Sequence, residues 1–246
     1  MKKVLSLFIA VVMLWTGFSL TVFAWERDGF LYAAVSEQEK TCKIVGCDDG
    51  ADSRELTIPA QLDGYTVTSI EREAFCNMTR IENVKIPDTV KYIGRYAFYY
   101  CTNLVSVTIP NGVIYIDDNA FLNCPSLRYV AIPSSVTSIE YKAFGYWYDA
   151  YEDLEKKVND FTIIGAKGSA AENYAKENDF RFISFGNINS DADVTAVDAR
   201  WALQAASGTR LLSDEQTQIA DVNGDGQVTA VDARWILQAA SGTRVL

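Results

Sequence analysis

A motif that returns every 23 residues constrains the fold of this chain more than any other feature. The dipeptide Ala-Phe ends at Phe75, Phe98, Phe121 and Phe144, and Ile-Pro recurs with the same step from Ile86 onward. Repeats with periods of 20–50 residues are typical of solenoids, in which stacked units bury one continuous core. Aliphatic residues return in the same register, at Ile81, Leu104 and Leu127; Val84, Val107 and Val130; Val90, Val113 and Val136; and Ile93, Ile116 and Ile139.

Each repeat predicts two short extended runs. Residues 104–109 alternate between apolar and polar side chains, which indicates a strand with one face buried. Pro110 ends this strand because proline has no N–H to continue the pairing. A second run around Val113–Ile116 leads to the Ala-Phe turn, whose ring we expect to fill the space between neighbouring coils.

These units, of the form Ala-Phe-x-x-Cys-x-x-Leu-x-x-Val-x-Ile-Pro, resemble the BspA-like family of leucine-rich repeats over about Leu56 to Phe144. The first unit departs from the pattern because it has Met78 where later units have Cys101 and Cys124. The resemblance implies a solenoid with caps. We expect the caps at 26–55, for the N-terminal starter, and at 161–165 and 169–182, for the closing segment.

An aromatic-rich loop, Gly145–Tyr151, interrupts the spacing before the closing cap. We expect its rings to seal the end of the solenoid, because the last repeat needs apolar closure. A stacking platform for sugars or for a partner is the alternative.

Composition excludes several classes of function. The chain has no histidine, which rules out a Ser-His-Asp or Cys-His nucleophile arrangement and any His-ligated zinc or iron site. The formal net charge of -10 argues against a nucleic-acid partner, since such proteins need a basic face.

The first 24 residues have the pattern of a secretory signal peptide. Lys2 and Lys3 precede an apolar run, and Val22-Phe23-Ala24 offers a cleavage site. We expect cleavage before Trp25, which leaves no membrane span; a retained membrane anchor is the alternative.

Five cysteines, an odd number, leave at least one thiol unpaired within the chain. Cys101 and Cys124 occupy equivalent repeat positions, and we expect them to be buried as small hydrophobic residues. Cys42 and Cys47 are close enough to pair locally, and the sequence leaves their disulfide state open.

The C-terminal quarter contains a second repeat. Residues 195–210 recur at 229–244 with one difference, Ala202 against Ile236. Upstream of the second copy, residues 221–232 fit a 12-residue calcium loop of the EF-hand type, with oxygen-bearing residues at alternate positions and Gly226 at the sharp turn. The predicted ligands of this loop are Asp221, Asn223, Asp225, Gln227, Thr229 and Asp232.

The corresponding first loop is a less complete copy. Asn187 replaces an aspartate at position one, which removes a charge, and Ala192 stands where glycine belongs. A left-handed conformation at Ala192 costs about 1–2 kcal/mol. We therefore expect two calcium sites, the first about 10-fold weaker because it has less charge; an unoccupied first site is the alternative. Its predicted ligands are Asn187, Asn189, Asp191, Asp193, Thr195 and Asp198.

Each loop runs into a predicted helix of about a dozen residues that ends before Gly208 or Gly242, glycine being common just after helix ends. No helix pattern that would complete a full EF-hand pair precedes either loop. Together the two loop-helix units resemble a type I dockerin over Gly186–Leu246. The resemblance implies calcium-dependent binding to a cohesin domain of a scaffoldin, in an extracellular complex that degrades plant polysaccharides, a cellulosome.

In that family, the pair before the last calcium ligand and positions further along the helix contribute to the choice of cohesin. Leu203 and Leu237 are equally consistent with core positions, and the small apolar pairs leave the matching cohesin unknown. Because the copies are nearly identical, two pseudo-symmetric binding modes are also consistent with the sequence. The residues so implied are Ala196, Val197, Leu203, Gln204, Ala230, Val231, Leu237 and Gln238.

The sequence therefore predicts an α+β protein: a leucine-rich-repeat solenoid of short strands at 25–184, followed by a small all-α dockerin with two calcium loop-helix units at 185–246. We expect a secreted, non-catalytic interaction protein whose repeats bind another protein, such as a cell-surface protein, or a polysaccharide. The alternative is a glycoside hydrolase acting through a pair of carboxylates.

Overall fold

The computed structural model of the protein describes residues 9–11, 22–47, 54–149 and 154–246. The chain divides into two units, each described by itself. The first comprises Met1–Val107, Gly112–Leu127 and Glu140–Val158; the second comprises Thr108–Asn111, Arg128–Ile139 and Asn159–Leu246. Most of the predicted signal peptide lies outside the described residues, as do residues 150 and 151 of the aromatic loop.

The first unit begins with antiparallel strands at the predicted N-terminal cap. Strands β1 to β4 pair antiparallel in sequence order, and β4 then pairs in parallel with β7. Strand β6 pairs antiparallel with β7. Their bounds are β1 Ile9–Val11, β2 Val22–Arg27, β3 Phe30–Ser36, β4 Thr41–Cys47, β6 Gln61–Leu62 and β7 Tyr65–Ile70.

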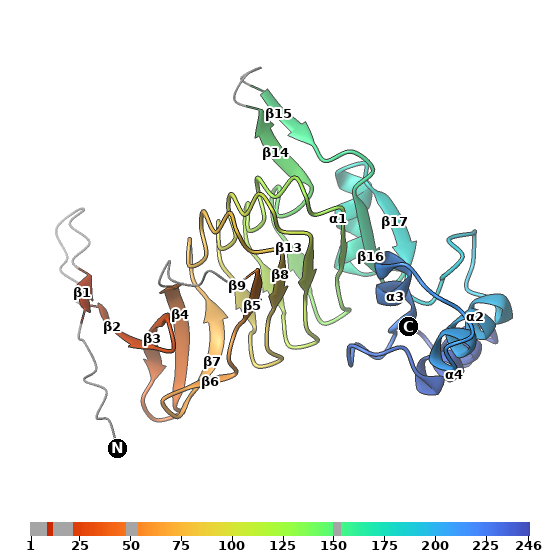
Figure 1. Ribbon diagram of the computed structural model, residues 1–246, viewed down its shortest axis with the longest axis horizontal. Helices are drawn as coiled ribbons and strands as arrows, with labels where there is room; N and C mark the ends of the chain where they lie inside the picture. The colour runs from red at the N-terminus through yellow and green to blue at the C-terminus, as the bar shows by residue number, and fades with distance from the viewer. Residues whose placement is uncertain (1–8, 12–21, 48–53, 150–153) are drawn as a thin grey trace. The chain divides into compact units, whose positions relative to one another are not determined.

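The repeats of the first unit alternate between two sheets, as the period predicts. Strands β7, β9 and β11 pair in parallel and follow one another in sequence order (Figure 1). On the other sheet, β5 pairs in parallel with β8. Their bounds are β5 Glu55–Thr57, β8 Asn83–Lys85, β9 Tyr92–Ile93 and β11 Tyr115–Ile116.

A ladder of stacked phenylalanine rings forms the core of the first unit. Phe75, Phe98, Phe121 and Phe144 are at most 1% exposed. Successive ring centroids lie 5.1, 4.8 and 4.7 Å apart, with interplanar angles of 15°, 7° and 13°. The prediction that each ring fills the space between coils is confirmed.

The repeat cysteines are buried beside this ladder, as predicted. The thiols of Cys101 and Cys124 donate to the main-chain oxygens of Phe75 and Phe98, over 3.3 and 3.2 Å. Burial raises the pKa of the Cys124 thiol well above its usual range. No disulfide joins Cys42 to Cys47 in the described part of the structure.

The aromatic loop forms a hairpin rather than a seal. Strand β14, Tyr146–Asp149, pairs antiparallel with β15, Leu154–Lys157. Tyr146 and Trp147 are half-buried and Tyr148 is 43% exposed. The predicted inserted loop is therefore present, but its rings remain partly at the surface because a hairpin places alternate side chains on opposite faces.

The second unit contains the predicted closing cap and the duplicated C-terminal segment. Strand β12 pairs in parallel with β10 and β16, and β16 pairs in parallel with β17. Helix α1 lies between β16 and β17 in sequence. The bounds are β10 Ser106–Thr108, β12 Tyr129–Ala131, β13 Ser138–Ile139, β16 Thr162–Gly165, α1 Ala170–Glu177 and β17 Arg181–Ser184.

Three further helices follow: α2 Ala196–Ala206, α3 Asp214–Ala220 and α4 Ala230–Ala240. The expectation that no helix before either loop would complete an EF-hand is wrong for the second loop, because α3 ends directly before Asp221. Ser213 and Gln216 form a capping box at its start, a signal visible in the sequence. Within this unit, the helices share one buried cluster with β16 and β17, made of Ile164, Ile183, Ile188, Ala199, Ala202, Ile219, Ala220, Ala233 and Ile236.

Within the described parts of the chain, no helix combines the length and apolar character needed to cross a membrane.

Candidate functional site: two loop-helix units

Helices α2 and α4 begin in the same way because both follow the same residues. Thr195 and Thr229 are the N-cap residues, and each side chain accepts a hydrogen bond from the main chain two residues on. The carboxylates of Asp198 and Asp232 accept from the main-chain N–H of these threonines, over 2.9 Å in both copies. Each helix is thus fixed to its loop by a reciprocal capping box.

The last predicted ligand of each loop is a buried carboxylate. Asp198 and Asp232 are 0% exposed. Each also accepts a main-chain N–H from across its loop, from Asn189 over 3.1 Å and from Asn223 over 3.3 Å. Among the described residues, no lysine or arginine forms an ion pair with either carboxylate, and a buried charge needs a counter-charge. A cation bound inside each loop would supply it.

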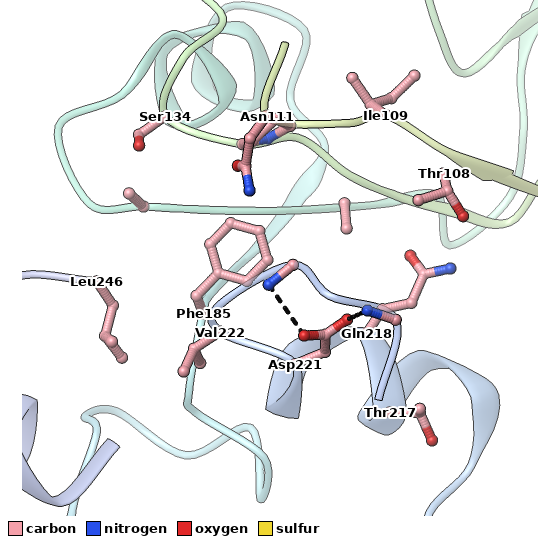
Figure 2. Close-up of a pocket in the computed structure, with 15 residues that line it drawn as sticks. Thr108, Ile109, Asn111, Ser134, Phe185, Thr217, Gln218, Asp221, Val222 and Leu246 are labelled. Atoms are coloured by element: carbon pink, nitrogen blue, oxygen red, sulfur yellow. Dashed lines mark hydrogen bonds between the residues drawn. The ribbon is translucent and has the colours of Figure 1, made fainter. Parts of the chain in front are cut away.

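In the second loop, Asp221 holds the loop closed. Its two carboxylate oxygens accept main-chain hydrogen bonds from Gly224, Asp225 and Gly226, over 2.9, 3.2 and 2.8 Å (Figure 2 shows this carboxylate with dashed lines to two of these nitrogens). Gly226 adopts a φ of 85°, as predicted for the sharp turn at position six.

Burial raises the pKa of the Asp221 carboxyl, and the nearby charges of Asp232 and Asp225 raise it further. Concentrated negative charge of this kind is stabilised by a bound divalent cation. The residue types are those that calcium prefers, namely carboxylate, amide and hydroxyl oxygens.

The other predicted ligands of the second loop surround the same turn. Asp225 accepts main-chain hydrogen bonds from Gln227 over 2.9 Å and donates its own N–H to Asn223 Oδ1 over 2.9 Å. The Thr229 hydroxyl donates to Asp232 over 3.0 Å. The structure therefore brings all six predicted residues of this loop together.

The first loop differs at Asn187. This residue is 5% exposed, and its side-chain oxygen is buried with no hydrogen-bond partner. Its amide nitrogen donates to the main-chain oxygen of Asp191 over 2.9 Å. An orphaned buried oxygen at position one is a feature that a bound cation would satisfy.

The predicted left-handed strain at Ala192 is wrong. Ala192 does not adopt a positive φ. Position four is left-handed in both loops, with a φ of 56° at Ser190 and 71° at Gly224, so the loops differ at position six. Without a glycine at position six, the first loop takes a different path and avoids the cost at Ala192. Of its other predicted ligands, Asp193 pairs with Lys167 over 3.2 Å, and Asn189 accepts the N–H of Asp191 over 3.1 Å.

No group of three or more His, Cys, Asp or Glu side chains in the described residues is arranged to hold a metal. The carboxylates of the second loop accept the loop's own N–H groups instead. The residue types nevertheless fit calcium in both loops, since amide, hydroxyl and main-chain oxygens can fill the coordination positions that the carboxylates leave open.

The predicted partner-binding residues lie on the surface in both copies. Val197 and Val231 are each 41% exposed, and Leu203 and Leu237 are 52% and 51% exposed. This exposure excludes a core position for the two leucines. Ala196 and Ala230 are exposed, and Gln204 and Gln238 are half-buried near the helix ends.

Sequence reasoning missed a pair of cation-π contacts. Arg210 lies 3.3 Å from the ring centre of Trp201, and Arg244 lies 3.4 Å from that of Trp235. The sequence did contain a signal for these contacts, since the Trp and Arg of both pairs recur at the same positions of the duplicated segment.

One side of the second loop borders a cavity of about 270 Å³ within the second unit (Figure 2). Asp221, Asn111 and Phe185 are among its lining residues. Asn111 donates to the main-chain oxygen of Asn223 over 3.4 Å.

Comparison with known families agrees with this geometry. Residues 54–155 match the BspA type leucine rich repeat region in 6 copies, and residues 186–239 match the dockerin type I domain. A search of curated proteins gave no match.

Solved structures of bacterial leucine-rich-repeat proteins are similar to the chain. One from Bacteroides capillosus is 30% identical, over 51% of this chain and 96% of that one, with a TM-score of 0.45. The T. pallidum protein is 22% identical over 65% of this chain and 64% of that one (TM-score 0.46), and a Bacteroides ovatus protein is 25% identical over 65% and 40% (TM-score 0.46).

The chain therefore carries a BspA type leucine-rich-repeat region, which contains the phenylalanine ladder, and a type I dockerin domain, which contains the two capped loop-helix units.

Proposed function

We propose that this chain is a secreted, non-catalytic interaction protein. Its dockerin binds a cohesin domain of a scaffoldin in a calcium-dependent way, and its repeats bind another protein or a polysaccharide. Leucine-rich repeats and type I dockerins are non-enzymatic families, and they cover 54–155 and 186–239 of the chain. The proposal includes cleavage of residues 1–24, an extracellular, cellulosome-associated location, and one calcium ion in each loop.

The observation that carries the proposal is that α2 and α4 expose the same apolar side chains to the same extent. The exposures of Val197 and Val231 are equal, and those of Leu203 and Leu237 differ by one percentage point. An exposed apolar residue at one position needs no explanation, but the same residues exposed on both copies of a duplicated helix form a surface suited to a partner.

Calcium, when bound, supplies the positive charge that the loop carboxylates lack. Asp221, Asn223, Asp225, Gln227, Thr229 and Asp232 would hold it in the second loop, and Asn187, Asn189, Asp191, Asp193, Thr195 and Asp198 in the first. Because Asp198 and Asp232 also complete the capping boxes of α2 and α4, a filled loop would fix the start of each binding helix.

The test uses the chain from Trp25 onward, immobilised and exposed to a panel of cohesins, beside the Asp225→Ala variant. We expect one or more cohesins to bind the unaltered protein and Asp225→Ala to bind at least about 10-fold more weakly, because it loses a charged ligand. Equal binding by both proteins would contradict the role of the loop.

The same protein is incubated with xylan, β-glucan and amorphous cellulose, and released reducing sugars are measured. We expect no release. Hydrolysis that disappears with a single Asp or Glu substitution in the repeats would instead establish the glycoside hydrolase alternative.

A further inference from the structure

One repeat of the first unit carries three tyrosines close together in the turn after β9. Tyr96, Tyr99 and Tyr100, here called the tyrosine surface, flank the buried Phe98 of the ladder. At the position of Tyr100, the repeats before and after have Asn77 and Asn123. The fourth repeat has Tyr146 there, so the tyrosine sets this repeat apart from its two neighbours but not from all the others.

Tyr100 occupies a backbone conformation that suits asparagine better than tyrosine. Its φ is 61°, and Asn77 and Asn123 each have a φ of 62°. Asparagine is enriched in this left-handed region, where a bulky residue is an outlier. Packing does not account for the tyrosine, because Tyr100 is 45% exposed. Strain of this kind, retained on an exposed side chain, points to a role outside the fold.

The rings of the tyrosine surface are held in fixed positions. The ring centroids of Tyr96 and Tyr99 lie 5.4 Å apart, and those of Tyr99 and Tyr100 lie 5.9 Å apart. The Tyr99 hydroxyl accepts a hydrogen bond from Asn123 Nδ2 over 3.3 Å, and Asn123 is itself 5% exposed. Its side-chain oxygen accepts the N–H of Tyr148, which ties the hairpin to the same place. A surface ordered in advance loses less entropy on binding.

Positive charge borders these rings. The Arg95 guanidinium lies 5.0 Å from the ring centre of Tyr96, and that of Arg72 lies 6.0 Å from it. Arg72 pairs with Glu73 over 2.9 Å, whereas Arg95 is exposed and forms no ion pair within the part of the chain that the structure describes. The charges of Asp118 and Asp117 act on Arg95 without forming an ion pair with it, so its guanidinium can still pair with an acidic group of a partner.

We propose that the tyrosine surface is a docking site for a protein segment that places an acidic side chain on Arg95 and apolar side chains against Tyr99 and Tyr100. This inference rests on the proposed function of the repeats and names one partner class. Tyrosine and arginine are the residues most enriched where protein partners bind strongly, and tyrosine loses little rotamer freedom on binding.

The ring planes favour a protein over a polysaccharide. The planes of Tyr96 and Tyr99 differ by 75°, and those of Tyr99 and Tyr100 by 44°. The three rings therefore offer no common flat platform for a stiff sugar chain. Side chains of a protein, which point in several directions, can each meet one ring.

In the experiment, a display library of random 12-residue peptides is selected for binding to the full chain from Trp25. Peptides that also bind the Tyr100→Asn variant are removed in a counter-selection step. We expect enriched peptides with Asp or Glu beside aromatic or aliphatic residues. Their affinity should fall at least about 10-fold with Tyr100→Asn and with Arg95→Ala, a loss within the range for central interface residues. Tyr141→Asn is the matched control, since Tyr141 is 65% exposed and lies outside the tyrosine surface.

Thermal melting of the same variants separates binding from folding. Tyr100→Asn should melt about 2 °C or more above the unaltered protein, because it relieves the strained conformation. A variant that binds less while melting higher cannot have lost binding by unfolding.

Peptides that bind Tyr100→Asn and Arg95→Ala as tightly as the unaltered protein would overturn the proposal. A second result would also overturn it: no peptide is enriched, and the protein binds glucuronoxylan or cello-oligosaccharides in a way that Tyr100→Asn abolishes. That result would assign the tyrosine surface to glycans. Cohesin binding, measured on each variant, should remain unchanged. If the unaltered protein bound no cohesin, the proposed docking function would fail, but the tyrosine surface would not be affected.

Discussion

Asp221 and Asn187 stand at the first position of the two loops, and they make opposite kinds of contact. Asp221 accepts three main-chain hydrogen bonds from its loop, whereas the side-chain oxygen of Asn187 is buried without a partner. One loop is therefore closed around a charged residue, and the other contains an unsatisfied neutral oxygen. The two halves of the duplicated segment share their helices but not the details of their loops.

Exchanging these two residues should exchange calcium affinities. Asn187→Asp adds a charged ligand, so the first site should bind calcium about 10-fold more tightly; Asp221→Asn should weaken the second site by a similar factor. Calorimetric titration of calcium into each variant measures both sites. Unchanged affinity in Asn187→Asp would show that position one of the first loop does not bind the ion.

Calcium should stabilise the second unit against heat. A ligand at 100 times its dissociation constant stabilises a folded protein by about 2.7 kcal/mol. The melting temperature followed by circular dichroism at helical wavelengths should therefore rise with calcium and fall again with EDTA. Asp232→Ala, which removes both a predicted ligand and one half of the capping box of α4, should abolish most of this dependence. A melting temperature indifferent to calcium would contradict metal binding in the loops.

The phenylalanine ladder should dominate the stability of the first unit. Phe98 is 0% exposed and stacks between two other rings, so Phe98→Ala should cost about 3–5 kcal/mol of unfolding free energy. Val105→Ala is the control in the same repeat, because Val105 is 47% exposed and should change stability by about 0.5 kcal/mol or less. Urea unfolding measures both, and equal effects would contradict the ladder as the core.

Two equivalent docking faces should make single substitutions nearly silent. If a cohesin can use either α2 or α4, then Leu203→Ala or Leu237→Ala alone should weaken binding by about 2-fold, since one of two equal modes remains. The double variant should lose about 30-fold or more, the usual effect of removing a central interface residue. Leu211→Ala is the control, because Leu211 is 94% exposed and lies outside both helices. A large loss from one single variant would mean that one face alone is used.

The repeat period was enough to predict the solenoid, because apolar columns such as Val90 and Val113 can be buried together only by stacking. The tight turn around Asp221 was predictable for a similar reason, since few sequences place oxygen-bearing residues at this spacing with a glycine at position six. Both predictions depend on local patterns that physical chemistry ties to one geometry.

Other features depended on contacts that a pattern does not contain. The conformation at Ala192 follows from the whole path of the first loop, and the partial exposure of Trp147 follows from a hairpin pairing with residues 154–157. The short helix before the second loop was overlooked because its seven residues show little periodicity, although Ser213 and Gln216 marked its start.

The central claim is tested most directly by calorimetry. A cohesin that binds in the panel is titrated into the chain from Trp25, first in calcium, then in EDTA, then with calcium restored. The account predicts tight binding in calcium, no measurable heat in EDTA, and full recovery when calcium is returned. Binding of equal strength in EDTA, with the loops shown to be free of metal, would contradict calcium-dependent docking.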